Sequence, residues 1–409
     1  MRRHYPEVKA AFAGAAMIVA IPAFAQSSVT LYGVVDNGIG YQSSSTTLGS
    51  ISGGHSQVKM ITGVWNGSRF GLKGAEDLGA GTKAIFTLEE GFNGNNGAMS
   101  TSNLMFSRQA FVGVSNVNYG SLTAGRQYES YYQLLVPYSP TTWLTGFSGA
   151  HPGDLDGFDA VYRANNTLLY MSPNLYGLKF SGSYSFAGVP GSAYQGSTWT
   201  AAIQYVQGPF GVAAGFSRIN NSNVNGGAFG ADTTTSNAGA QEAISAVNFG
   251  YQSARAQQRF AVAAGYTFSS EFDISATYSN VQYIPGAGSA FHDEAIWNTG
   301  GIALHWKPSV VWDFGVGYSY TRATKANGIS SNASYQQVSL AEYYSLSKRT
   351  GLYALQAYQR ANGQTLAPNA MGGGTQIINA TATIGDGFNS SPSSSRNMVS
   401  LSVGIVHRF

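Results

Sequence analysis

A pattern repeated along most of the chain constrains its fold more than any other feature. Segments of roughly ten residues place apolar, often aromatic, side chains at every second position, as in Phe260–Phe268 and Trp312–Tyr320. The intervening positions hold mainly Gly, Ala, Ser, Thr or Asp. Because successive strand side chains point to opposite faces, each segment is predicted to be a strand with one apolar face. The last segment, Val399–Phe409, ends on an aromatic residue, which is typical of a barrel strand that meets a membrane interface.

Short connections rich in turn residues alternate strictly with longer Gly-, Ser- and Asn-rich stretches. The seven short connections are 76–81, 116–120, 173–177, 208–211, 269–272, 308–311 and 347–350. The eight long stretches are 42–57, 93–103, 128–164, 187–196, 220–257, 282–296, 321–335 and 360–395. This alternation predicts sixteen strands. The fold class is therefore all-β, a transmembrane antiparallel β-barrel with short periplasmic turns and long extracellular loops. Such a barrel encloses a water-filled lumen, so the expected function depends on that aperture.

The first 25 residues are predicted to be a secretory signal peptide that is cleaved, leaving residues 26–409 as the barrel. Arg2, Arg3 and Lys9 give the segment a basic start. Residues 10–21 are apolar but too few to span a bilayer. Ala23-Phe24-Ala25 then supplies a cleavage signal with small residues at its two ends.

Composition supports an exported membrane barrel. Charged residues make up only 10% of the chain, aromatic residues make up 13%, and there are 52 glycines. Beyond the signal, no run reaches the roughly 18 apolar residues of a transmembrane helix. The chain has 22 Lys and Arg against 19 Asp and Glu, and the predicted signal contains three of these bases and one of these acids, so the remainder carries a net charge of +1. This balance argues against a nucleic-acid partner, and the absence of cysteine excludes disulfides and thiolate metal sites.

Several motifs together resemble a known family. They are Val29–Asp36 (VTLYGVVD), Ser68–Gly79 (SRFGLKGAEDLG), Phe106–Gly113 (FSRQAFVG), Gly120–Gln127 (GSLTAGRQ), Leu346–Thr350 (LSKRT) and the terminal His407-Arg408-Phe409. The chain resembles general porins of Gram-negative bacteria, of the neisserial and β-proteobacterial (Burkholderia- and Comamonas-like) type. The resemblance implies homotrimers in the bacterial outer membrane, in contact with lipid and lipopolysaccharide. It also implies one pore per subunit, with the third long loop folded into the lumen and, in several members, a preference for anions.

A basic pore wall is predicted from the second strand and its neighbours. If Phe70 and Leu72 face lipid, Arg69 and Lys73 face the lumen, because a charge on the lipid face at mid-depth costs about 2–4 kcal/mol. By resemblance, Arg108 and Arg126 occupy positions where related porins carry lumen arginines. The predicted wall of the constriction is therefore Arg69, Lys73, Arg108 and Arg126.

The stretch 128–164 is predicted to be the constriction loop, because it is the most apolar of the long loops and needs burial against a wall. It carries the acids Glu129, Asp154, Asp156 and Asp159, and these would face the basic wall and create a transverse field. The spacing of its aspartates is incomplete for a calcium loop. The histidines form no close pair. Neither a metal nor a cofactor is therefore expected, and no enzymatic site can be assembled.

The sequence thus predicts an outer-membrane channel for passive diffusion of small hydrophilic solutes and ions, with a weak preference for anions. Two alternatives remain open at this stage. One is a substrate-selective outer-membrane channel, and the other is a barrel that serves mainly as an adhesin or structural protein. The terminal Phe409 resembles the signal by which outer-membrane barrels are recognised for assembly.

Overall fold

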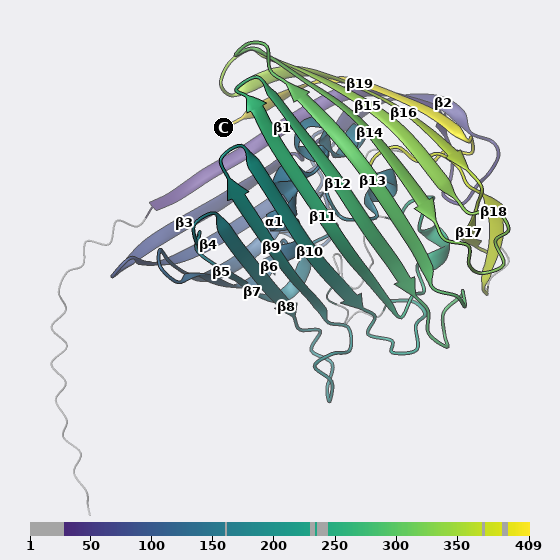
Figure 1. Cartoon of the computed structure of the whole chain (residues 1–409), viewed down its shortest axis with the longest axis horizontal. Coiled ribbons are helices and arrows are strands. Elements are labelled where there is room, and N and C mark those ends of the chain that lie inside the picture. The colour runs from purple at the N-terminus through teal and green to yellow at the C-terminus, as the bar shows by residue number, and fades with distance from the viewer. Residues whose placement is uncertain (1–27, 160–161, 230–233, 235–243, 370–372, 387–391) are drawn as a thin grey trace, which may run out of the picture.

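The computed structural model describes residues 28–159, 162–229, 234, 244–369, 373–386 and 392–409. The predicted signal peptide, residues 1–25, lies outside the described residues. Most of the described chain forms one antiparallel sheet that curves around a central space (Figure 1). The strands of this sheet are β1 (Ser28–Ser45), β2 (His55–Thr62), β3 (Arg69–Gly79), β4 (Thr82–Gly91), β5 (Gln109–Asn116), β6 (Gly120–Gln127), β7 (Ala164–Met171), β8 (Leu178–Ser185), β9 (Thr198–Gln207), β10 (Phe210–Asn220), β11 (Ala256–Ser269), β12 (Phe272–Ile284), β13 (Ala295–Trp306), β14 (Trp312–Ala323), β15 (Ser334–Ser345), β16 (Thr350–Asn362) and β19 (Asn397–Arg408).

The sheet closes on itself as a barrel. From β3 to β16 each strand pairs with the next one along the chain, and β16 pairs with β19. The last strand, β19, also pairs with β1, from Val34 opposite Arg408 to Gln42 opposite Ser400. Two of the seventeen strands, β2 and β3, both pair with β1. β3 pairs with the first half of β1, and β2 pairs with the second half. They are therefore two halves of one interrupted wall strand. The described residues thus form the sixteen-stranded antiparallel barrel that the sequence predicts.

The two faces of the wall follow the predicted alternation. On β14, Trp312, Val316 and Tyr318 are exposed on the outside, whereas Gly315 and Gly317 are buried on the inside. Barrel closure satisfies the backbone groups that an open sheet would leave unpaired in lipid. The apolar residues therefore form the outer surface of the barrel, and the small and polar residues line its interior.

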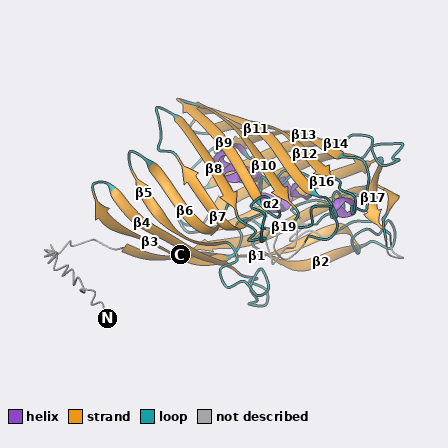
Figure 2. Ribbon diagram, turned by 90° about the horizontal axis from the view of Figure 1, so that it is seen from below, coloured by secondary structure: helices purple, strands orange, loops and turns teal. Residues whose placement is uncertain are grey.

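Short turns join the strands at one end of the barrel and long loops join them at the other, where β17 (Gln364–Pro368) and β18 (Thr375–Asn379) form a separate hairpin (Figures 1 and 2). The loop after β6 enters the barrel. It contains α1 (Ser130–Leu135), α2 (Thr141–Gly149) and the 3-10 turns η1 (Val136–Tyr138) and η2 (Pro152–Asp154). Among the described residues, every helix is too short or too polar to cross a membrane.

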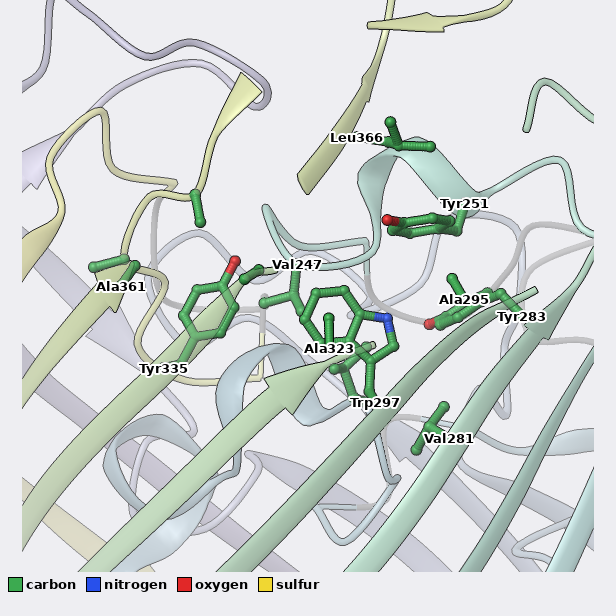
Figure 3. Close-up of a cluster of buried hydrophobic side chains, with 14 of the residues drawn as sticks. Val247, Tyr251, Val281, Tyr283, Ala295, Trp297, Ala323, Tyr335, Ala361 and Leu366 are labelled. Atoms are coloured by element: carbon green, nitrogen blue, oxygen red, sulfur yellow. The ribbon is translucent and has the colours of Figure 1, made fainter. Parts of the chain in front are cut away.

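An apolar core lies inside the barrel, near the ends of β11 to β16. Trp297 and Tyr335 of the wall meet Val247 and Tyr251 of the loop before β11 and Leu366 of β17, and all of them are buried (Figure 3). The 3-10 turn η3 (Phe249–Tyr251) carries Tyr251, whose ring meets Trp297 edge-on at 6.2 Å between centroids. Long loops therefore pack into the barrel on this side instead of standing free in solvent.

Candidate functional site in the barrel lumen

The loop between β6 and β7 is fixed to the inner wall at its first helix. Tyr131 and Leu135 of α1 are buried against β10, where a side chain at Gly215 would collide with both. The side-chain amide of Gln204 on β9 also donates a hydrogen bond of 3.0 Å to the carbonyl of Leu134. Helix α1 is therefore seated on the wall by a close apolar contact and by a buried polar one.

The second helix is fixed in the same way further round the inner wall. Leu144 of α2 occupies space that side chains at Gly315 and Gly317 of β14 would fill. The side-chain amide of Gln337 on β15 donates to the carbonyls of Ser148 at 2.9 Å and Ala150 at 3.1 Å. Since α1 contacts β8 to β10, η1 contacts β11 and β12, and α2 contacts β13 to β16, this part of the loop runs along the inside of the wall.

Three of the predicted loop acids are buried between the loop and the wall. Glu129 accepts a hydrogen bond of 2.8 Å from Ser217 of β10, and Asp156 accepts one of 2.6 Å from Ser279 of β12. Asp154 accepts the backbone N–H of Asp159 at 3.0 Å. These carboxyl groups hold the loop in place, and none of the three lies among the residues that line the main lumen cavity.

The surroundings of these acids shift their pKa values in different directions. Burial raises the pKa of Glu129 and raises that of Asp154 well above its ordinary value. Burial also acts to raise the pKa of Asp156, but the Nδ1 atom of His151, 2.6 Å away, holds that pKa below its ordinary value. An ionised Asp156 thus pairs with His151 inside the loop, whereas the proton is favoured on Asp154.

A cavity of about 1050 Å³ lies beside the loop, against the wall formed by β3 to β6. Its basic lining residues are Arg69, Arg108, Arg126 and Arg163, and its acidic ones are Glu89, Asp159 and Asp386. Three of the predicted wall residues therefore line this cavity. Lys73 does not, because it lies further along β3, with its ammonium group 5.3 Å from the centre of the Tyr32 ring.

Glu89 of β4 is shared by two of the arginines. Its carboxylate contacts the Nε of Arg108 at 2.8 Å and the Nε of Arg69 at 3.5 Å. Arg126 is held separately, donating to the carbonyl of Ser107 at 2.7 Å and to Asn165 at 2.5 Å. Four guanidinium groups thus face one wall carboxylate, and this part of the lining carries excess positive charge.

Asp159 is the one predicted loop acid that lines the cavity. Its carboxyl group is hydrogen-bonded to that of Asp386, from the loop before β19. Burial raises the pKa of Asp159, and the negative charges of Asp386 and Asp154 raise it further. Sequence reasoning did not find Asp386 or assign Arg163 to the wall, because loop residues follow no alternation that would give their direction.

Phe409 completes the contact between the first and last strands. Its N–H donates to the carbonyl of Gly33 and its carbonyl accepts from the N–H of Gly33, both at 3.1 Å. Its ring lies over Gly33, where a side chain would collide with it. This placement shows how the residue seals the barrel, while its role as an assembly signal stays a prediction.

The part of the chain that the structure describes contains no group of three or more His, Asp or Glu side chains arranged to hold a metal ion. The site is therefore described by its arginines, its carboxyl groups and its aromatic rings alone.

Comparisons with known proteins agree with this architecture. The sequence model of the Gram-negative porin family matches residues 10–364. An outer membrane porin of Bordetella pertussis is 35% identical over 236 residues, which are 52% of this chain and 58% of that protein. Outer membrane porin protein 32 of Delftia acidovorans is 35% identical over 174 residues, 40% of this chain and 45% of that protein. The matches thus span about half the length of these curated relatives.

Among solved structures, the anion-selective porin from Comamonas acidovorans superimposes with a TM-score of 0.66 at 21% identity, covering 94% of this chain and all of that one. OmpT of Vibrio cholerae superimposes with a TM-score of 0.60 at 14% identity, covering 94% and 98% of the two chains. These two likenesses concern the fold. Together with the family match over most of the sequence, they show that this chain belongs to the Gram-negative porin family and is an outer-membrane β-barrel.

Proposed function

We propose that this protein forms a water-filled channel through which small hydrophilic solutes and ions diffuse passively across the outer membrane. The observation that carries the proposal is the polar cavity of about 1050 Å³ beside the inward loop. Passive diffusion needs no reacting group, so the protein is proposed to have no catalytic activity. Segment 128–164 is the proposed constriction loop, and its two anchored helices keep it from moving freely.

The proposed channel prefers anions. Charges at a narrow point between low-dielectric walls dominate ion selectivity. Here Arg69, Arg108, Arg126 and Arg163 outnumber the acids of the lining, and burial favours a proton on Asp159. A porin of similar fold from Comamonas acidovorans is described as anion-selective, which supports the same preference in this chain.

The assembly proposed for the protein is a homotrimer, with residues 1–25 removed on export. The apolar outer surface of each subunit would then meet either a neighbouring subunit or the lipid and lipopolysaccharide of the outer membrane. Phe409 is proposed as the assembly signal, in addition to its place beside Gly33.

The test is conductance of the purified, folded protein in planar lipid bilayers, in a gradient of potassium chloride. We expect open channels in steps of three and a reversal potential on the chloride side. The double variant Arg69→Glu and Arg108→Glu should move the reversal potential towards potassium. Lys73→Glu is the control for one such charge reversal outside the cavity, and its shift should be smaller than that of Arg69→Glu or Arg108→Glu alone.

Folded protein without conductance would reject the channel. A double variant that behaves like Lys73→Glu would reject these arginines as the filter while leaving the channel in place.

A further inference from the structure

Two arginines converge on one phenol oxygen inside the proposed filter. Tyr128 follows β6, and its hydroxyl oxygen accepts hydrogen bonds from Arg108 Nη2 at 2.8 Å and Arg163 Nη2 at 3.1 Å. The guanidinium group of Arg163 also lies over the Tyr128 ring, 4.8 Å from its centre. The ring of Tyr132, from α1, lies 5.1 Å away between centroids. The hydroxyl of Tyr128 is therefore fixed in position between two cations.

Such an arrangement of donors is usual around an anion. Guanidinium groups converge most often on carboxylate or phosphate oxygens, because their N–H groups match the lone pairs of those atoms. A phenol oxygen has two lone pairs, and two N–H donors occupy both of them. The Tyr128 oxygen therefore takes the position that an oxyanion or a chloride ion would take between Arg108 and Arg163.

We propose that Tyr128 is a specificity-determining residue that occupies an anion-binding position in the lumen and so weakens the retention of anions passing the arginines. The inference rests on the proposed function and deepens it. An anion that reaches Arg108 and Arg163 must compete with the phenol oxygen for the same N–H donors. The residue thus keeps the attraction of the wall from becoming a trap that would slow transport, since conduction requires binding sites that release their ions.

The surroundings of Tyr128 also affect its charge. Burial acts to raise the pKa of Tyr128, but Arg108 and Arg163 outweigh burial and lower it below its ordinary value of 10.0. Glu89 of β4 acts in the opposite direction. The other titratable or charged groups that interact with Tyr128 are Arg69 of β3, Arg126 of β6, Tyr32 of β1 and Tyr132 of α1.

The test compares wild-type protein with Tyr128→Phe, which removes one oxygen atom and keeps the ring. In the variant, conductance should saturate at a lower chloride concentration, and the reversal potential should move further towards chloride. In the wild type, anion preference should also fall as pH rises through the pKa of Tyr128, because a phenolate places a negative charge between the two arginines. Tyr128→Phe should lose that part of the pH profile.

Tyr132→Phe is the matched control, because it removes a hydroxyl from a neighbouring ring in the same cavity but not from between the two arginines. It should retain the pH-dependent fall in anion preference. A Tyr128→Phe channel with unchanged saturation and an unchanged pH profile would overturn the inference, although the channel itself would stand.

A second measurement does not depend on conductance. The near-ultraviolet absorbance of tyrosinate, titrated in detergent, should show that one tyrosine ionises before the others in wild-type protein and in Tyr132→Phe. That early step should be absent from Tyr128→Phe. If the early step persists in Tyr128→Phe, the inference fails whether or not the protein conducts.

Discussion

The two sides of the barrel interior differ although the same strand pattern builds both. On the side of β3 to β6, long charged residues such as Arg69, Glu89 and Arg126 point inward, and the cavity remains open beside them. On the side of β10 to β16, many inward residues are Gly, Ala or Ser, and helices and loops pack directly against the wall. The difference shows that the size of inward side chains determines where the loops dock and where the lumen stays open.

The close contacts on the second side show this relation in detail. Tyr138 lies where side chains at Gly211 and Gly265 would be, and His151 lies where one at Gly301 would be. A larger residue at these positions would collide with the loop, as packed interiors tolerate little added volume. The passage is therefore set off-centre, towards the arginines.

The largest effect is expected when the packed side is weakened. Leu144→Ala removes a buried side chain that α2 inserts against β14. It should lower the free energy of unfolding by about 2–5 kcal/mol, measured by chemical denaturation in detergent. Leu401→Ala is the control, because Leu401 is 42% exposed on the outer face, and its loss should be clearly smaller. Equal losses of unfolding free energy in the two variants would mean that the contact between Leu144 and β14 stabilises the protein no more than an exposed leucine does.

A smaller effect, which depends on pH, is expected at the loop anchor. The pKa of Asp154 is raised in the folded protein, so its stabilising contribution is present below the ordinary value of 3.8 and is lost as pH rises through the raised pKa. Asp154→Asn keeps an acceptor for the N–H of Asp159 but cannot ionise. Its melting temperature should therefore fall less than that of the wild type as pH rises. Parallel pH curves for the two proteins would contradict this account.

The smallest effect is expected on the open side. Asp159→Asn removes an acid opposite the arginines, but burial and Asp386 already favour a proton on this carboxyl group. Its reversal potential in a potassium chloride gradient should thus move only slightly towards chloride at neutral pH, and the shift should increase under alkaline conditions. A large shift at neutral pH would show that Asp159 is fully charged in the channel.

Most of the barrel could be predicted from sequence because strands repeat with period two. The strand number, the order of turns and loops, and the outward faces are confirmed. The break between β2 and β3 was not predicted. Its backbone turns inward, and the carboxylate of Asp36 accepts the N–H groups of Trp65 at 2.6 Å and Asn66 at 2.7 Å. An aspartate that points inward from a strand gives no sign in the sequence that it will bind the backbone of a break in the neighbouring strand.

The site was predictable only where it lies on, or next to, strands. Alternation and the family resemblance located Arg69, Arg108 and Arg126, which line the cavity. The directions of the loop acids could not be deduced, because 128–164 turns several times and each turn changes which side chains face the wall. Asp386 enters from a loop far away in sequence, and such a contact leaves no local signal.

The seam between β1 and β19 has a consequence for how the protein folds. Until β19 reaches β1, the growing sheet has two unpaired edges, which attract other strands and are costly in lipid. Sealing joins the most distant parts of the chain, and such long-range pairings form slowly. We therefore expect closure to be a late step of folding. A chain that has lost β19 would lack both pairings, with β1 and with β16, and would remain an open, aggregation-prone sheet instead of a slightly narrower channel.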